Sequence, residues 1–71
     1  MTNSVLLASK IKESGYTCSI IAKELGITRQ GLWKKINNRS EFKQTEIEKI
    51  SRLLNLDAEV SNLIFFTVDV D

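Results

Sequence analysis

The stretch TCSIIAKELGITRQGLWKKINN, residues 17–38, decides the fold of this chain. Its apolar residues recur every three or four positions on both sides of Gly26, which is the period of an amphipathic helix. Glycine readily adopts the left-handed conformation that a tight turn needs. We therefore predict two helices, residues 18–25 and 29–37, joined by a short turn. The side chains expected to point inward are Cys18, Ile21, Ala22 and Leu25 in the first helix, and Leu32 and Ile36 in the second.

Small and cap-forming residues stand where a close pair of helices needs them. Ala22 is small, as two closely crossing helices require, and Ile27 would fill the angle between them. Thr17 and Thr28 each precede a helix and are good N-caps. Gly31 costs about 1 kcal/mol relative to alanine inside a helix, so its position should gain from a close backbone approach. This is the helix-turn-helix pattern, in which the second helix enters the major groove of DNA.

Helical periodicity continues on both sides of this pair, without a linker or repeat. Gly15 should end the helix before the pair, and Asp57 should cap the last helix. Thr45 and Glu48 suggest a capping box for the helix between. We thus expect one all-α domain of five helices, residues 1–71. The three further helices are predicted over residues 3–14, 44–54 and 58–63, with apolar residues Leu7 and Ile11; Ile47, Ile50, Leu53 and Leu54; and Val60 and Leu63.

The last residues of the chain follow a different apolar pattern from the helical residues before them. From Phe66 on, apolar and polar residues alternate with the period of a short extended strand. A lone strand in a helical domain has no partner for its backbone groups, so residues 64–71 are expected to pair with a second copy in a two-fold dimer. Alternatively, the aromatic residues close the chain's own core and the last residues fray. The expected dimer contacts are Phe65, Phe66, Val68 and Val70.

Composition argues against catalysis and against a bound metal. The 71 residues include no histidine, one cysteine and three glycines. We therefore expect no disulfide, zinc site or phosphate-binding glycine loop, and Cys18 should be a small buried side chain. No stretch is apolar enough for a membrane span, and no secretory signal is recognisable. The sequence predicts a cytoplasmic protein that is not an enzyme and has no cofactor, metal or small-molecule substrate.

Charge divides the chain into two unlike parts. Residues 1–43 carry eight Lys/Arg against three Asp/Glu, a net charge of +5, whereas residues 44–71 carry two against six, a net charge of −4. Such a division favours one surface made for an anionic partner. Charges that only solvate the two ends of a domain would produce the same division.

With these residues in view, the chain resembles the phage Cro/repressor (XRE-type) helix-turn-helix family. Within that family it is most similar to short Cro-like regulators of temperate phages of Gram-positive hosts. The resemblance covers about residues 7–66 and is carried by GITRQ (26–30), KINNRSEFK (35–43) and the pair Phe65–Phe66. It implies a five-helix, lambda-repressor-like domain whose second motif helix reads DNA.

Three residues depart from the family pattern. Lys35 stands where an apolar residue is usual, so its stem should lie along the edge of the core. Cys18 replaces a glutamine that commonly braces the reading helix or contacts DNA. Asn38 replaces the usual glycine after that helix, and asparagine tolerates the left-handed region better than most residues.

The outer face of the predicted helix over residues 29–37 would read the DNA. Glutamine pairs with adenine, and arginine or lysine with guanine or phosphate, whereas Trp33 would touch a thymine methyl or a sugar. Trp33 could instead be a half-buried packing residue, and Arg29 and Lys34 plain surface charges. The expected base-reading residues are Arg29, Gln30, Trp33 and Lys34. The expected phosphate contacts are Thr17, Ser19, Thr28, Asn37, Asn38, Arg39 and Lys43.

The resemblance implies a repressor of a phage lysis–lysogeny switch, acting in the bacterial host cell. It would bind double-stranded operator DNA as a homodimer and block polymerase sterically. One alternative is a modulator that uses this scaffold to bind the opposing phage repressor, which the net charge of +1 and the residue Cys18 favour. A DNA-binding antitoxin is a weaker alternative.

Overall fold

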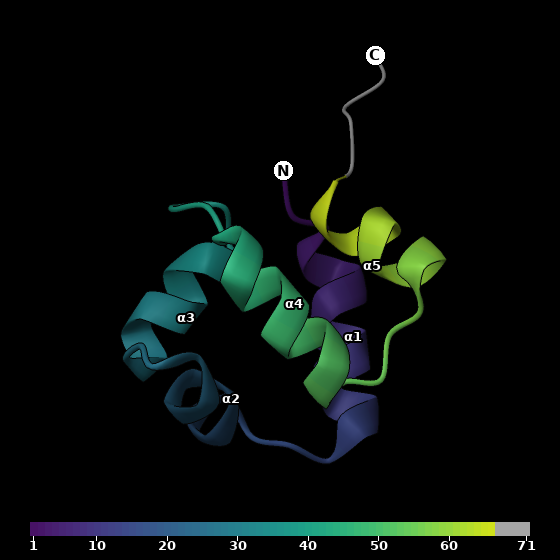
Figure 1. Cartoon of the computed structure of the whole chain (residues 1–71). Helices are drawn as coiled ribbons and strands as arrows, with labels where there is room; N and C mark the ends of the chain where they lie inside the picture. Colours follow the sequence, from purple (N-terminus) through teal and green to yellow (C-terminus); the bar gives the residue numbers. More distant parts are fainter. Residues whose placement is uncertain (67–71) are drawn as a thin grey trace.

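The computed structural model describes residues 1–66, which form five helices and no strand (Figure 1). The helices are α1 (Ser4–Ser14), α2 (Cys18–Leu25), α3 (Arg29–Ile36), α4 (Gln44–Leu53) and α5 (Ala58–Phe65). The all-α, five-helix architecture is thus confirmed, with bounds that differ from the predicted ones by no more than two residues. In the described part of the chain, no helix is both long enough and apolar enough to cross a membrane.

Polar side chains cap the starts of four helices. Asn3, Thr17, Thr28 and Asp57 each accept a hydrogen bond from the backbone N–H three residues later, at 3.1, 3.2, 2.9 and 2.8 Å respectively. Each bond satisfies an amide that the first helical turn leaves without a partner, and it stabilises the helix by about 1 kcal/mol. The predicted caps Thr17, Thr28 and Asp57 are therefore confirmed.

The start of α4 differs from the prediction. Its N-cap is Lys43, whose backbone N–H donates to the Glu46 carboxylate at 2.8 Å. The predicted capping box of Thr45 and Glu48 is wrong, because Thr45 already lies inside the first turn and is too late to be the N-cap. Glu46, three residues after the true cap, is the side chain that reaches back.

Three helices end in the same left-handed motif. The residue with positive φ is Gly26 after α2, Asn38 after α3 and Asn55 after α4. In each case this residue and the next donate their N–H groups back to carbonyls of the last turn, which is the Schellman motif. Asparagine visits the left-handed region at low cost. Asn38 can therefore occupy the left-handed position after α3 that glycine usually fills.

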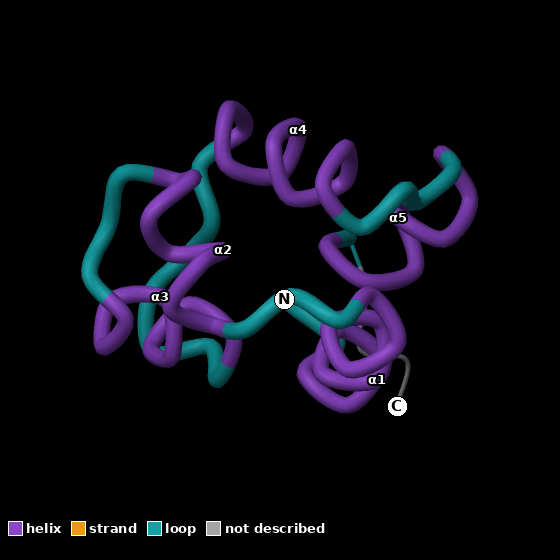
Figure 2. Tube along the Cα trace, turned by 90° about the horizontal axis from the view of Figure 1, so that it is seen from below, coloured by secondary structure: helices purple, strands orange, loops and turns teal. Residues whose placement is uncertain are grey.

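A single core joins all five helices. α4 packs against α2 and α5, while α1 packs against α3 and α5, so that the helices surround one core (Figure 2). The fully buried side chains come one from each helix, and burial of each contributes roughly 2 kcal/mol of hydrophobic stabilisation. Cys18 is partly buried and packs against this core. The fully buried residues are Leu7, Ile21, Leu32, Ile50 and Ile64.

α5 runs two residues beyond its predicted end. Ile64 is fully buried and Phe65 is 5% exposed, with the Phe65 ring edge-on to Phe42 and 5.3 Å between ring centroids. These two residues follow Val60 by one helical turn and continue its inward face, whereas Leu63 points outward and is 55% exposed. The expectation that Phe65 belongs to an exposed dimer segment is therefore wrong, because this ring closes the chain's own core.

Three more residues of the segment 64–71 were predicted to form dimer contacts, namely Phe66, Val68 and Val70. Phe66 ends α5 and is 52% exposed, so its aromatic ring is accessible. Val68 and Val70, with the predicted strand, lie outside the described residues. Ile64 and Phe65 belong to the core, so neither is available for the predicted dimer contact.

Residues 2–4 lie at the start of the chain and include the first residue of α1, and we call them the N-terminal strap. They link the end of α3 to the end of α5 through backbone and side-chain hydrogen bonds. The strap therefore fixes the point where the chain leaves α3. Its bonds are Thr2 with the Asn38 side chain (2.7 and 2.9 Å), the Asn3 N–H with the Ile64 carbonyl (2.6 Å), and the Ser4 hydroxyl with the Ile36 carbonyl.

Candidate nucleic-acid interface

α2 and α3 form a helix-turn-helix pair with a rigid turn. Gly26 adopts φ 71° and its N–H donates to the Lys23 carbonyl at 3.1 Å, while the Ile27 N–H donates to the Ala22 carbonyl at 3.0 Å. Ala22 is 2% exposed, and Ile27 packs against the core. The turn is therefore held by hydrogen bonds on one side and by packing on the other, and it fixes where α3 begins.

α3 lies at the edge of the molecule, with one face inward and the other open (Figure 1). Leu32 is fully buried and Ile36 packs against the core. Trp33 is 52% exposed, so it is not part of the packed interior. All four side chains predicted to read bases are exposed, namely Arg29, Gln30, Trp33 and Lys34.

The residues predicted to contact phosphates are exposed as well. One group lies at the starts of α2 and α3, and the other lies in the loop after α3, residues 37–43. The hydroxyls of Thr17 and Thr28 accept the cap bonds and keep their own hydrogens for donation. The exposed residues are Thr17, Ser19, Thr28, Asn37, Asn38, Arg39 and Lys43.

Asn38 is already engaged within the fold. Its Oδ1 accepts from the Thr2 N–H at 2.7 Å, and its Nδ2 donates to the Thr2 carbonyl at 2.9 Å and to the Ser4 hydroxyl at 3.4 Å. A side-chain contact with phosphate would break these bonds, so the geometry gives Asn38 the role of fixing the loop. Asn37 is less constrained, because its Nδ2 donates only to the Trp33 carbonyl, at 2.9 Å.

An ion pair that sequence reasoning missed fastens the loop to both neighbouring helices. Lys35 Nζ lies 3.1 Å from the Glu46 carboxylate, and the two side chains are 13% and 7% exposed. Lys35 also donates to the Glu41 carbonyl at 2.9 Å, and Glu46 accepts from the Lys43 N–H. A lysine at the edge of a core needs an acidic partner. That requirement was the signal that could have pointed to Glu46.

A second missed contact joins the loop to the outer face of α3. The Arg39 guanidinium carbon lies 5.4 Å from the centroid of the Trp33 ring. The Arg39 N–H donates to the Lys34 carbonyl at 2.8 Å, as the last bond of the Schellman motif at Asn38. The pair spans the end of a helix, so its proximity depends on the left-handed residue between and not on helical spacing.

The lack of a side chain at Gly31 leaves room for the Thr28 hydroxyl that caps α3. A methyl group at this position would lie 3.1 Å from the Thr28 hydroxyl oxygen, which is closer than ordinary van der Waals contact. That hydroxyl accepts the Gly31 N–H at 2.9 Å. The group that comes close to Gly31 is therefore a side-chain hydroxyl of its own helix cap and not the approaching backbone that was expected.

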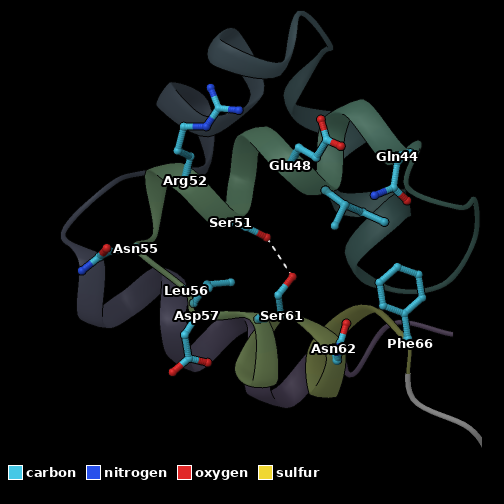
Figure 3. Close-up of a pocket in the computed structure, with 12 residues that line it drawn as sticks. Gln44, Glu48, Ser51, Arg52, Asn55, Leu56, Asp57, Ser61, Asn62 and Phe66 are labelled. Carbon is cyan, nitrogen blue, oxygen red and sulfur yellow. Dashed lines mark hydrogen bonds between the residues drawn. The ribbon is translucent and has the colours of Figure 1, made fainter.

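A groove between α4 and α5 is the other notable surface feature (Figure 3). The Ser51 and Ser61 hydroxyls share a hydrogen bond of 2.9 Å between the two helices. Charged side chains of both signs line the groove, including Glu48, Arg52 and Asp57. None of the residues predicted to contact DNA lines it. The groove and the candidate interface are therefore formed by different residues.

Comparisons with protein-family models, with curated proteins and with solved structures find no match for this chain. Among residues 1–66, no three His, Cys, Asp or Glu side chains come together in a way that could hold a metal ion. A function can consequently be inferred only from the exposed side chains of α3 and of the loop that follows it.

Proposed function

We propose that this protein is a sequence-specific DNA-binding transcriptional regulator, a Cro-like repressor that reads operator DNA with α3. The observation that carries the proposal is the outer face of α3. There Arg29, Gln30, Trp33 and Lys34 are all exposed on the second helix of a helix-turn-helix pair. Such a helix fits the major groove, where each base pair presents a distinct pattern of donors and acceptors.

The recognition chemistry follows from the side chains. Gln30 would pair with the N6 and N7 atoms of adenine, and Arg29 and Lys34 would donate to guanine or to a phosphate. Around them, the cationic Arg39 and Lys43 would neutralise phosphates and release counterions. Repression is then steric, because a protein bound at an operator blocks polymerase without any chemical step.

We further propose that the protein acts as a homodimer. The exposed Leu63 and Phe66 at the end of α5 give a second copy an apolar surface to cover. A two-fold dimer would present two α3 helices about 34 Å apart, which is one turn of DNA, and would match a near-palindromic operator.

Selection from a pool of random DNA duplexes, with the purified protein at near-physiological salt, tests this proposal. Enrichment of a short near-palindrome is the expected result, and the spacing of its halves would give the dimer geometry. Affinity should fall steeply as salt rises, because counterion release drives the phosphate contacts. Recovery of no common motif would overturn the proposal.

A second candidate function is a modulator that binds the opposing phage repressor. Ile20, in the first turn of α2, is 44% exposed. This apolar side chain lies next to the predicted phosphate contact Ser19, where polar groups would serve a DNA reader better. A modulator would recover no motif by itself, and it would lower operator affinity when added to its repressor partner.

A further inference from the structure

The pair of Arg39 and Trp33 places a cation on the surface that should face DNA. The guanidinium carbon lies 5.4 Å from the ring centroid, within the range in which an arginine is attracted to an aromatic face. Trp33 remains 52% exposed and Arg39 is exposed as well. The pair therefore lies on the open surface of α3, where a bound duplex could reach it.

The backbone holds both partners in place. Trp33 belongs to α3, and the Arg39 N–H donates to the Lys34 carbonyl at 2.8 Å. Asn38, directly before Arg39, has φ 62° and exchanges two hydrogen bonds with Thr2. Because the loop is already fixed, stacking loses little of the conformational entropy that usually weakens a surface pair.

The edge of the arginine decides whether it can also bind a phosphate. A guanidinium that stacks flat on a ring uses its face and keeps the N–H groups of its edge free. Those groups match two phosphate oxygens in a bidentate geometry. Arg39 follows the C-terminal end of α3, and residues at that end of a recognition helix can meet the sugar–phosphate backbone beside the groove.

We propose that Trp33 is a positioning residue, which holds the Arg39 guanidinium ready for a phosphate of the bound duplex and reads no base itself. The inference rests on the proposed function and changes the role of Trp33 within it. The ring is occupied by the protein's own cation, and so its effect on binding passes through Arg39. A lysine at position 39 would keep the charge but lose the planar stacking.

The stack is tested first in the free protein by nuclear magnetic resonance. The side-chain protons of Arg39 should be shifted upfield by the ring, and Trp33→Leu should abolish that shift. Trp33→Phe should retain part of it, because phenylalanine keeps an aromatic face. Thermal unfolding followed by circular dichroism controls for the fold, which should survive because Trp33 lies outside the core. Unshifted Arg39 protons in the unmodified protein would overturn the stack.

The role of the stack is tested with duplexes selected by the unmodified protein. Trp33→Leu should weaken binding about two- to five-fold, which is the value of an exposed cation–π pair expressed as a ratio of affinities. It should do so equally on the selected duplex and on duplexes with single base-pair changes. Arg39→Met should reduce the slope of log affinity against log salt by about 1 per copy bound. Adding Trp33→Leu to Arg39→Met should cause no further loss.

Three other results are possible, and each would contradict a different part of the proposal. If Trp33→Leu relaxes the preference at one base pair, Trp33 reads that base and is not a positioning residue. If the losses from Trp33→Leu and Arg39→Met simply add, the ring does not act through the arginine. If the unmodified protein selects no duplex at all, the proposed function fails, and this inference fails with it.

Discussion

At the scale of single residues, two small opposing effects meet at Gly31. Alanine would stabilise the helix there by about 1 kcal/mol through backbone entropy. The added methyl group would also lie 3.1 Å from the Thr28 hydroxyl oxygen and crowd the cap of α3, which is itself worth about 1 kcal/mol. The two effects have similar magnitudes, so neither dominates while the cap is present.

Removal of the cap should therefore change the sign of the Gly31 substitution. With Thr28 present, Gly31→Ala should change the free energy of unfolding by less than about 0.5 kcal/mol. The higher helix propensity of alanine and the crowding of the Thr28 hydroxyl by the new methyl group offset each other. In a Thr28→Ala background the hydroxyl is gone, and the same change should stabilise by about 1 kcal/mol. Urea unfolding measures both values. Equal effects in the two backgrounds would show that the cap is not crowded.

The residues proposed to read bases allow a direct prediction. Gln30→Ala and Lys34→Ala should each weaken binding to the selected duplex by about 1–3 kcal/mol if each loses a base contact. Both side chains are exposed, so unfolding should hardly change. Lys12→Ala on α1 is the matched control, since it removes an exposed lysine outside the interface. Wild-type affinity for both interface variants would show that α3 does not read the DNA.

At the scale of elements, the loop after α3 is fastened by an ion pair. Lys35 on α3 and Glu46 on α4 lie 3.1 Å apart with little exposure, and both also bond to backbone groups of the loop. Removing one partner of such a pair leaves a charge with poor access to water. Removing both charges together leaves no such penalty.

The pair should therefore show strong coupling in stability. Lys35→Met should destabilise the protein by about 3 kcal/mol, because Glu46 then keeps its charge without a cation beside it. The double variant Lys35→Met, Glu46→Gln should recover most of that loss, since glutamine still accepts the Lys43 N–H. Urea unfolding of the two single variants and of the double variant gives the coupling. Additive losses would contradict the role assigned to this pair.

Helical periodicity and caps predicted the elements well, because both depend on neighbours along the chain. Thr17, Thr28 and Asp57 are the clearest cases, and each caps the helix it was assigned to. Contacts between elements were missed, among them the ion pair of Lys35 with Glu46 and the approach of the Arg39 guanidinium to the Trp33 ring. These depend on how separate helices and helix ends come together, and no local pattern encodes that arrangement. Phe65 was predicted to be exposed for the same reason. Its packing against Phe42 and the core, which lengthens α5, involves residues that are distant in the sequence.

At the scale of the whole molecule, the basic residues of the candidate interface and the exposed apolar residues at the end of α5 lie on different elements. The exposed basic side chains of the candidate interface come from α3 and from the loop after it. The exposed Leu63 and Phe66 lie at the end of α5. One surface can thus meet an anion while another meets an apolar partner. This separation is what a DNA-binding dimer requires.

A dimer through the end of α5 should depend on Phe66 and not on Phe65. Phe66→Ser removes an exposed ring, so we expect the molar mass from light scattering to fall by half, to the 8.1 kDa of one chain. The fold should persist, because Phe66 lies outside the core. Phe65→Ser would instead unfold the protein and is not informative. An unchanged dimer mass for Phe66→Ser would place the dimer surface elsewhere.

The N-terminal strap has a consequence for how the molecule forms. Its partners, Asn38 and Ile64, are far along the chain, and the ribosome makes residues 2–4 long before either of them. Contacts between residues so distant in sequence close late, because the intervening loop must first lose its entropy. The strap reaches its full set of bonds only after α5 has emerged, because Ile64 lies in α5. A nascent chain that stops short of α5 would lack the bond between Asn3 and Ile64 that joins the strap to the last helix.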